Sequence, residues 1–255
     1  MKRLVLALAV GLVSCKGDAA KPDPELPKVS SPSDVDDAHG KLVDPAIARD
    51  AVIVEPGDPS KGAAEPLVVI VEWSDFQCPY CGGFATALDE LAAAYPDDVR
   101  IVFKQFPLPM HPDAELGARA TLAAHAQGRF WAMHDLLFRD RTKMSRDDVV
   151  SHAKDLGLDI PKFETALDDG STGGRVAADK RAGAALGIRG TPSFFVNGRP
   201  FSGALPPQEL RRVIDDERAL GQSIVAAGST RGDVYGRIIR AAQSGATPSL
   251  PEAPQ

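Results

Sequence analysis

The pattern of hydrophobic and polar positions predicts alternating strands and helices from about residue 51 onward. Residues 67–71 are a continuous run of Leu, Val and Ile, which is typical of a central strand covered on both faces. Residues 84–95 carry apolar side chains at helical spacing. The apolar Val99, Ile101 and Phe103 stand with the basic Arg100 and Lys104 in a pattern that predicts a further strand. Residues 51–54 predict a short edge strand before these elements.

The second half of this pattern is first helical and then returns to strands. Residues 113–186 have helical spacing throughout. Residues 193–196 and 199–202 flank an Asn-Gly pair, the strongest two-residue hairpin signal, and a proline-started helix is predicted over 206–220. The order predicts an α/β fold, namely a thioredoxin-like βαβ…ββα framework with an inserted all-helical subdomain.

The start of the chain resembles the signal of bacterial lipoproteins. A basic start precedes an apolar run over residues 4–13, which is too short for the roughly 20 residues that span a bilayer. The run ends in the sequence LVSC, which resembles a lipobox with Cys15 as its cysteine. The resemblance implies a cleaved signal peptide over residues 1–14 and an acylated Cys15. The protein is then expected to be exported and lipid-anchored to a bacterial membrane, facing the periplasm or the cell exterior.

The remaining boundaries follow from composition. Residues 15–50 are rich in Pro, Asp, Lys and Ser without apolar periodicity, and they predict a disordered tether behind the acylated cysteine. The folded domain is expected over residues 51–220, with its helical insertion at about 113–186. Residues 221–255 form a C-terminal extension with a short amphipathic helix, which either packs back on the domain or makes a dimer contact. The net charge of −6 argues against nucleic acid as a partner, because phosphate backbones are bound by basic surfaces.

Candidate chemistry lies at a Cys-x-x-Cys motif between the predicted buried strand and the helix. Cys78 is expected at the helix N-terminus with Pro79 at the first helical position, and Tyr80 and Cys81 follow. Unpaired amides and the helix dipole there stabilise a thiolate, which lowers the pKa of Cys78. Cys81, one turn further, should be more buried and less reactive. The motif therefore predicts a redox-active disulfide in which Cys78 exchanges with substrate and Cys81 completes the internal bond, with no other cofactor.

A metal site and a purely structural disulfide are the alternatives at this motif. A zinc or copper site normally needs two more soft ligands, and none of the five histidines has ligand spacing near the pair, so no metal is expected. A structural disulfide of this spacing would be small and strained. His134 lies in an apolar helical pattern and is expected in the core, whereas His111 lies in a loop that either lines a substrate groove or has no role.

Three segments resemble the DsbA-like family of thiol–disulfide oxidoreductases. The sequence VEWSDFQCPYC, ending at Cys81, is similar to the active-site segment of membrane-anchored members with a Cys-Pro-Tyr-Cys centre. Residues 128–138 resemble a segment of the family's helical insert, and residues 187–198 resemble its cis-proline loop and hairpin. The resemblance runs from about residue 52 to 220 and covers neither the predicted tether nor the extension.

The resemblance adds two expectations about the site. It implies that Thr191 and Pro192 form a cis peptide that lies against the cysteines. It also implies an acidic residue, Glu72, below the disulfide, where desolvation would raise the pKa of its carboxyl and let it take or relay the proton of Cys81. From the residues alone, Glu72 could equally reach solvent at the end of its strand.

The expected activity is donation of the Cys78–Cys81 disulfide to exported proteins with free thiols, through a mixed disulfide at Cys78. The family resemblance favours this oxidase direction and implies a quinone-linked membrane partner that reoxidises the pair. Two alternatives stay open at this point. One is a membrane-tethered disulfide reductase or isomerase, and the other is a non-catalytic peptide-binding chaperone.

Overall fold

The computed structural model describes residues 48–244. The predicted signal peptide, Cys15 and the predicted tether up to residue 47 lie outside the described residues, as does the end of the C-terminal extension. Within the described part, every helix is too short or too polar to cross a bilayer.

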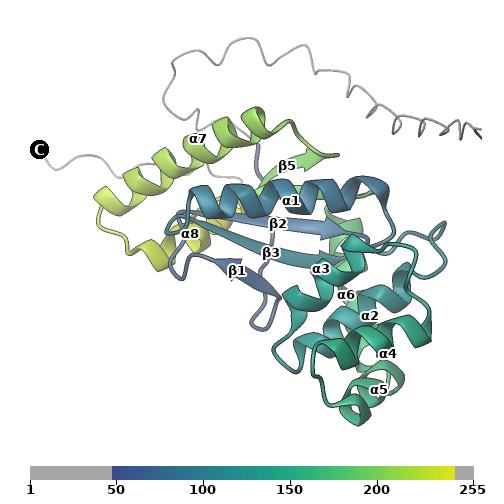
Figure 1. The fold of residues 1–255 in the computed structure, drawn as a ribbon. Helices are drawn as coiled ribbons and strands as arrows, with labels where there is room; N and C mark the ends of the chain where they lie inside the picture. Colours follow the sequence, from purple (N-terminus) through teal and green to yellow (C-terminus); the bar gives the residue numbers. More distant parts are fainter. Residues whose placement is uncertain (1–47, 245–255) are drawn as a thin grey trace, which may run out of the picture. The chain divides into compact units, whose positions relative to one another are not determined.

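A mixed sheet of five strands forms the centre of the domain, in the order β1-β3-β2-β4-β5 (Figure 1). The central strand β2 is buried at every residue, as its apolar run predicts, and it pairs in parallel with β3 and antiparallel with β4. The strands are β1 (Ser60–Gly62), β2 (Val68–Ser74), β3 (Val99–Gln105), β4 (Ser193–Val196) and β5 (Arg199–Ser202). The sheet therefore carries the βαβ…ββ framework that the sequence order predicts.

The edge strand predicted at residues 51–54 is wrong, and Ser60–Gly62 forms the edge instead. The Val52 N–H donates to the Asp50 carbonyl only two residues away, at 2.9 Å, so the chain turns and cannot extend a ladder. Val52 is nevertheless fully buried. The apolar residue that suggested a strand thus anchors an irregular segment on the domain.

Helices cover both faces of the sheet and form the insertion (Figure 1). One face packs against α1 and α7, and its core includes Phe84, Leu88 and Ile214. The predicted helical block is confirmed as α2 to α6, whose own core is apolar and aromatic. The helices are α1 (Pro79–Ala94), α2 (Ala114–His125), α3 (Phe130–Arg139), α4 (Arg146–Asp155), α5 (Ile160–Asp168), α6 (Ser171–Ala185), α7 (Pro207–Ala226) and α8 (Val234–Gln243), with a short 3-10 turn, η1 (Arg231–Asp233).

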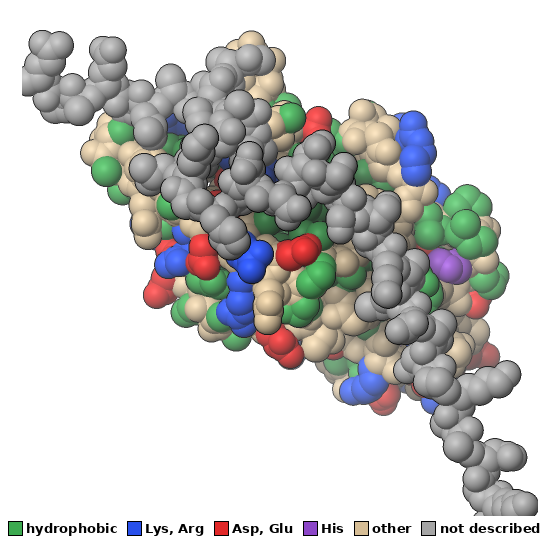
Figure 2. Space-filling view, turned by 90° about the horizontal axis from the view of Figure 1, so that it is seen from above, with side chains coloured by type: hydrophobic (Ala, Val, Ile, Leu, Met, Phe, Trp, Pro, Cys, Tyr) green, Lys and Arg blue, Asp and Glu red, His purple; other side chains and the backbone are tan. Residues whose placement is uncertain are grey.

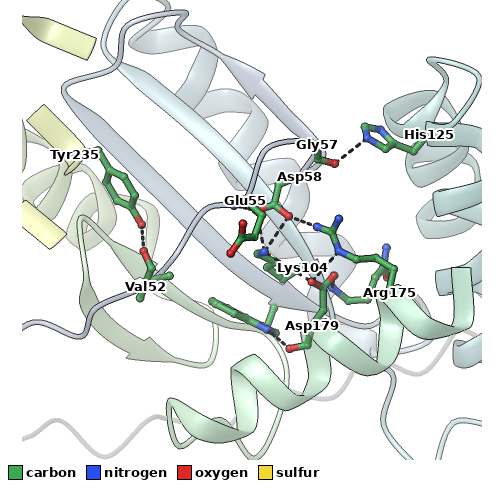
Figure 3. A network of polar contacts seen from close by, with 11 residues as sticks. Val52, Glu55, Gly57, Asp58, Lys104, His125, Arg175, Asp179 and Tyr235 are labelled. Atoms are coloured by element: carbon green, nitrogen blue, oxygen red, sulfur yellow. Dashed lines mark hydrogen bonds and ion pairs between the residues drawn. The ribbon is translucent and has the colours of Figure 1, made fainter. Parts of the chain in front are cut away.

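The C-terminal end of the described chain packs on its own domain. Helix α7 continues six residues past the predicted end at 220, because Gly221 lets it cross β2 closely: a Cβ there would lie 2.9 Å from the Leu67 Cβ. Val234 and Ile238 of α8 are buried in the main core. The Tyr235 hydroxyl donates to the Val52 carbonyl at 2.7 Å (Figure 3). Of the two expectations for the predicted amphipathic helix, packing back is the one observed.

A buried ion network joins the helical insertion to the sheet (Figure 3). Lys104 of β3 donates to the Asp58 carboxylate at 2.8 Å, and Arg175 of α6 pairs with the same carboxylate. Arg175 also donates to Asp179 at 3.2 Å, and the Asp179 carbonyl accepts the Trp73 indole N–H at 2.9 Å. These charges come from three separate parts of the chain, so the network fixes the insertion against the strand that leads to the cysteines.

On the surface, Figure 2 shows acidic and basic side chains interspersed where the described residues are visible.

Replacing Lys104 with methionine should destabilise the domain by about 3 kcal/mol, because it leaves buried carboxylates with too few cations. The Lys104 side chain is only 4 % exposed. Urea denaturation measures the change. Lys143→Met is the matched control, since that amine is 63 % exposed in its pair with Asp140 and should matter little. Equal losses in the two variants would contradict a stabilising role of the network.

Candidate redox site

The local sequence places the two cysteines at the start of α1. Cys78 is the N-cap residue in an extended conformation (φ −66°, ψ 126°), and Pro79 occupies the first position of the helix. The Cys78 N–H donates to the Asp75 carbonyl at 3.1 Å, which closes the turn between β2 and α1. Both cysteines carry free thiols here, and Cys81 is the more deeply buried, as its place one turn into the helix predicts.

The loop before β4 lies directly against Cys78. Thr191–Pro192 is a cis peptide bond, as the family resemblance implies. When Cys78 is protonated, its thiol donates to the Thr191 carbonyl oxygen, which lies 3.3 Å from the sulfur. Residues that are more than a hundred positions apart in the chain are thus brought together at the redox pair.

The two thiols have opposite electrostatic environments. The hydrogen bond from the Cys81 thiol is the main cause that lowers the pKa of Cys78 to about 6, against an opposing effect of burial. Backbone hydrogen bonds at Tyr80 and Cys81 add to the lowering. Burial, followed by the neighbouring Cys78 sulfur, raises the pKa of Cys81 well above its ordinary value. At neutral pH the pair therefore holds a thiolate at Cys78 and a thiol at Cys81.

Glu72 is buried in β2, six residues before Cys78. Its side chain is 1 % exposed, so the alternative in which it reaches solvent is wrong. Because side chains alternate along a strand, Glu72 lies on the same face of β2 as Ser74. Burial raises the pKa of Glu72 to about 8, although the Lys61 ammonium opposes this. The Glu72 Oε2 atom meets no hydrogen-bond donor among residues 48–244, and the carboxyl is protonated at pH 7.

One acidic residue of the redox site, Asp75, has partners that the sequence did not reveal. The buried Asp75 carboxylate accepts the Gln77 N–H at 2.8 Å, as a turn residue would. It also accepts the Leu108 N–H and the His111 Nδ1–H, each at 2.8 Å. A sequence signal did exist, because the carboxyl ends of parallel strands meet at one edge of a sheet and these residues follow β2 and β3. Only the strand register decides which side chains meet there.

His134 lies in the core, as expected, next to a cavity beside the redox helix. Its ring packs edge-on against Phe76 and Phe138, and burial lowers its pKa. The cavity between α1 and α3 has a volume of about 430 Å³ and is lined by Pro79 and Gly82, among others. Within the described residues, no cluster of three or more His, Cys, Asp or Glu side chains is arranged to hold a metal ion.

Residues 69–215 match the DSBA-like thioredoxin domain family. The chain belongs to this family. A thioredoxin-like oxidoreductase from Silicibacter pomeroyi DSS-3 is 30 % identical, with a TM-score of 0.61 over 67 % of this chain and 97 % of that one. The catalytic domain of Proteus mirabilis ScsC is 25 % identical, with a TM-score of 0.57 over 67 % of this chain and 94 % of that one. The fold and family expected from the sequence are thereby confirmed.

The residues that match the DSBA-like family include both cysteines of the redox pair. A periplasmic thioredoxin-like protein from Salmonella enterica serovar Typhimurium is 25 % identical, with a TM-score of 0.55 over 66 % of this chain and 94 % of that one. Two curated relatives are Na⁺/H⁺ antiporters. NhaA 3 of Salinispora tropica is 40 % identical over 59 % of this chain, and NhaA of Herminiimonas arsenicoxydans is 34 % identical over 66 %. This DSBA-like chain spans about a quarter of the length of these antiporters, 24 % and 27 %.

Proposed function

We propose that this chain is an extracytoplasmic protein thiol:disulfide oxidoreductase that donates its Cys78–Cys81 disulfide to exported proteins with free thiols. The observation that carries the proposal is the division of roles between the two cysteines. Cys78 has a lowered pKa of about 6 and lies against the Thr191 carbonyl, while Cys81 is buried with a raised pKa. A thiolate next to a protected thiol is the arrangement that disulfide exchange needs.

The reaction proceeds in two exchanges. A substrate thiolate attacks the Cys78 sulfur of the oxidised pair, the Cys78–Cys81 bond breaks, and the Cys81 sulfur leaves with the electron pair. A second substrate thiolate then attacks the substrate sulfur of the mixed disulfide and releases Cys78 as a thiolate. The substrate loses two electrons and gains a disulfide, and the enzyme gains the same two electrons as a dithiol.

Glu72 is suited to supply the proton that Cys81 takes up in the first exchange. Its carboxyl is protonated at neutral pH and lies on the same face of β2 as Ser74, in the strand that leads to the cysteines. Protonation of the leaving Cys81 sulfur prevents it from attacking the mixed disulfide again. Pro79, Tyr80 and the cis Thr191–Pro192 peptide hold the geometry around Cys78, and the pair needs no further cofactor.

The oxidase direction rests on the stability of the reduced state. A low pKa at Cys78 stabilises the dithiol form and makes the disulfide a better oxidant. Acylation at Cys15 would hold the domain at a bacterial membrane, where a quinone-linked partner reoxidises the pair. The LVSC sequence and the Pro-rich segment that follows it support this anchoring.

The reduction potential of the Cys78–Cys81 pair tests the direction. The pKa of about 6 for Cys78 lies between the roughly 7 of thioredoxin and the roughly 3.5 of DsbA. We therefore expect a potential between about −270 and −120 mV, the values of those two proteins. Equilibration in glutathione buffers measures it, and a value at or below roughly −270 mV would make this chain a reductase.

A further inference from the structure

The carboxylate of Asp75 lies where two segments meet, the turn before Cys78 and the loop between β3 and α2. This loop, residues 106–113, is called the β3–α2 loop below. The Asp75 side chain is 0 % exposed. A buried carboxylate is costly unless hydrogen bonds replace its lost hydration. Two of the donors that do so here, the Leu108 N–H and the His111 Nδ1–H, come from the β3–α2 loop.

Asp75 also shapes the backbone that carries Cys78. Its carboxylate accepts the Gln77 N–H at 2.8 Å, and its carbonyl accepts the Cys78 N–H at 3.1 Å. The side-chain and main-chain oxygens of one residue thus close two overlapping turns. The Cys78 carbonyl then accepts the Cys81 N–H at 3.3 Å, at the start of α1. The direction in which the chain enters the helix at Cys78 therefore depends on Asp75.

Gln77 fastens the same loop to the same turn. Its side-chain carbonyl accepts the Asp113 N–H at 2.7 Å, and its amide donates to the Asp113 carboxylate at 3.4 Å. The turn before Cys78 is thus tied to the β3–α2 loop through two of its residues. His111 is the contact that can be changed most gently, because its side chain is 21 % exposed whereas Asp75 is fully buried.

The position of Cys78 matters because its thiolate is stabilised by contacts that depend on direction. The hydrogen bond from the Cys81 thiol is the main cause of its lowered pKa, and backbone hydrogen bonds at Tyr80 and Cys81 assist. Such bonds weaken steeply when their angles deteriorate. A nearby negative charge acts in the opposite sense, because it disfavours a thiolate. Positioning by Asp75 and the charge of Asp75 therefore change the pKa of Cys78 in opposite directions.

We propose that Asp75 is the positioning residue of the redox pair: its carboxylate and its carbonyl fix Cys78 at the start of α1, and His111 holds that carboxylate in place. This proposal rests on the proposed function, because it assigns a role within the same redox site. Asp75 takes no part in the electron transfer. It accepts hydrogen bonds from the backbone that leads to the reacting sulfur.

The pH dependence of Cys78 alkylation, read on its own peptide by mass spectrometry, tests this role. In Asp75→Asn, whichever way the amide turns, its NH2 group faces another donor and the turn loosens. The pKa of Cys78 should then rise by about one unit, equivalent to roughly one lost hydrogen bond. The reduction potential should become more negative, because a weaker thiolate stabilises the reduced pair less. An unchanged pKa would leave Asp75 a purely structural residue, and a lowered pKa would leave it only a charge; either result would overturn the positioning role.

Asp58→Asn is the matched control. The Asp58 side chain is 1 % exposed and belongs to the ion network of Lys104 and Arg175. It also accepts a backbone N–H close in sequence, that of Glu55 at 2.7 Å. This variant should lose stability and keep the wild-type pKa of Cys78. An equal rise of that pKa in Asp58→Asn and Asp75→Asn would show a general effect of destabilisation and would overturn the proposal.

Two variants of His111 test the same role without altering the buried carboxylate. Asparagine can place an amide N–H near the position of the imidazole Nδ1–H, whereas leucine has no donor. His111→Leu should therefore raise the pKa of Cys78, and His111→Asn should restore it. Equal pKa values in these two variants would overturn the part assigned to His111. Alkylation needs no substrate protein, so if the wild type transferred no disulfide, the proposed function would fail and the titration would still decide the role of Asp75.

Discussion

Replacing Cys78 with serine should abolish disulfide transfer, with a loss of kcat/KM of roughly three orders of magnitude or more. Serine fits the same site, but its hydroxyl can form neither the internal disulfide nor the mixed disulfide. The buried Cys81 cannot replace it, because its pKa is raised and the residue is inaccessible. The measurement is the oxidation of a reduced, unfolded protein, followed as the loss of free thiols.

Two further cysteine variants control this result. Cys15→Ser should transfer disulfides at the wild-type rate in solution, because Cys15 is predicted to carry lipid and to lie outside the redox pair. Cys81→Ser should likewise lose disulfide transfer, because without the Cys81 sulfur no internal disulfide forms that a substrate thiolate could attack. A chaperone would instead keep its function in Cys78→Ser. Full activity of that variant would therefore disprove the proposed oxidoreductase.

Replacing Glu72 with glutamine should remove a large part of the pH dependence of stability. The pKa of Glu72 is about 8 in the folded protein, against an ordinary 4.5. Between pH 4.5 and 8 the folded protein therefore keeps the carboxyl protonated, whereas the unfolded chain has lost that proton. The stabilisation is complete below pH 4.5 and is lost as the pH rises through 8. The free energy of unfolding should fall by about 1.4 kcal/mol per pH unit, or roughly 4 to 5 kcal/mol between pH 4.5 and 8.

Urea unfolding at pH values from 5 to 8 measures this effect. The wild type should lose stability across the range, whereas Glu72→Gln should lose much less and should be the more stable protein at pH 8. Glu90→Gln, at an exposed position of α1, is the control and should keep the wild-type pH dependence. Parallel curves for wild type and Glu72→Gln would refute the buried, protonated carboxyl. The same variant should also slow disulfide transfer if Glu72 supplies the proton to Cys81.

The elements near the redox pair were predictable because local chemistry decides them. The apolar run of β2 can only be a covered strand, and Pro79 directly after Cys78 starts a helix at its preferred position. Asn197 and Gly198 adopt positive φ values of 48° and 85°, as a tight hairpin turn requires. The contact between Cys78 and the cis-proline loop was expected only through the family resemblance, because spacing along the chain contains no information about it.

The errors lie where one side chain serves a distant element. Val52 suggested an edge strand, but it is an anchor under the Tyr235 hydroxyl. The predicted end of α7 missed Gly221, which has no helical signal and is needed for close packing on Leu67. In both cases a residue far away in the chain decided what the local pattern becomes: Tyr235 for Val52, and Leu67 for Gly221.

The sequence by itself determined the framework of this protein and its chemistry: the order of strands and helices, the helical insertion and the two cysteines at a helix start. These depend on interactions within a few residues, which periodicity and capping express directly. The tertiary structure alone decided the burial of Glu72 and the bond between Asp75 and His111. Those depend on the register of β2 against β3 and on the desolvation that packing imposes, and neither is encoded in the spacing of residues.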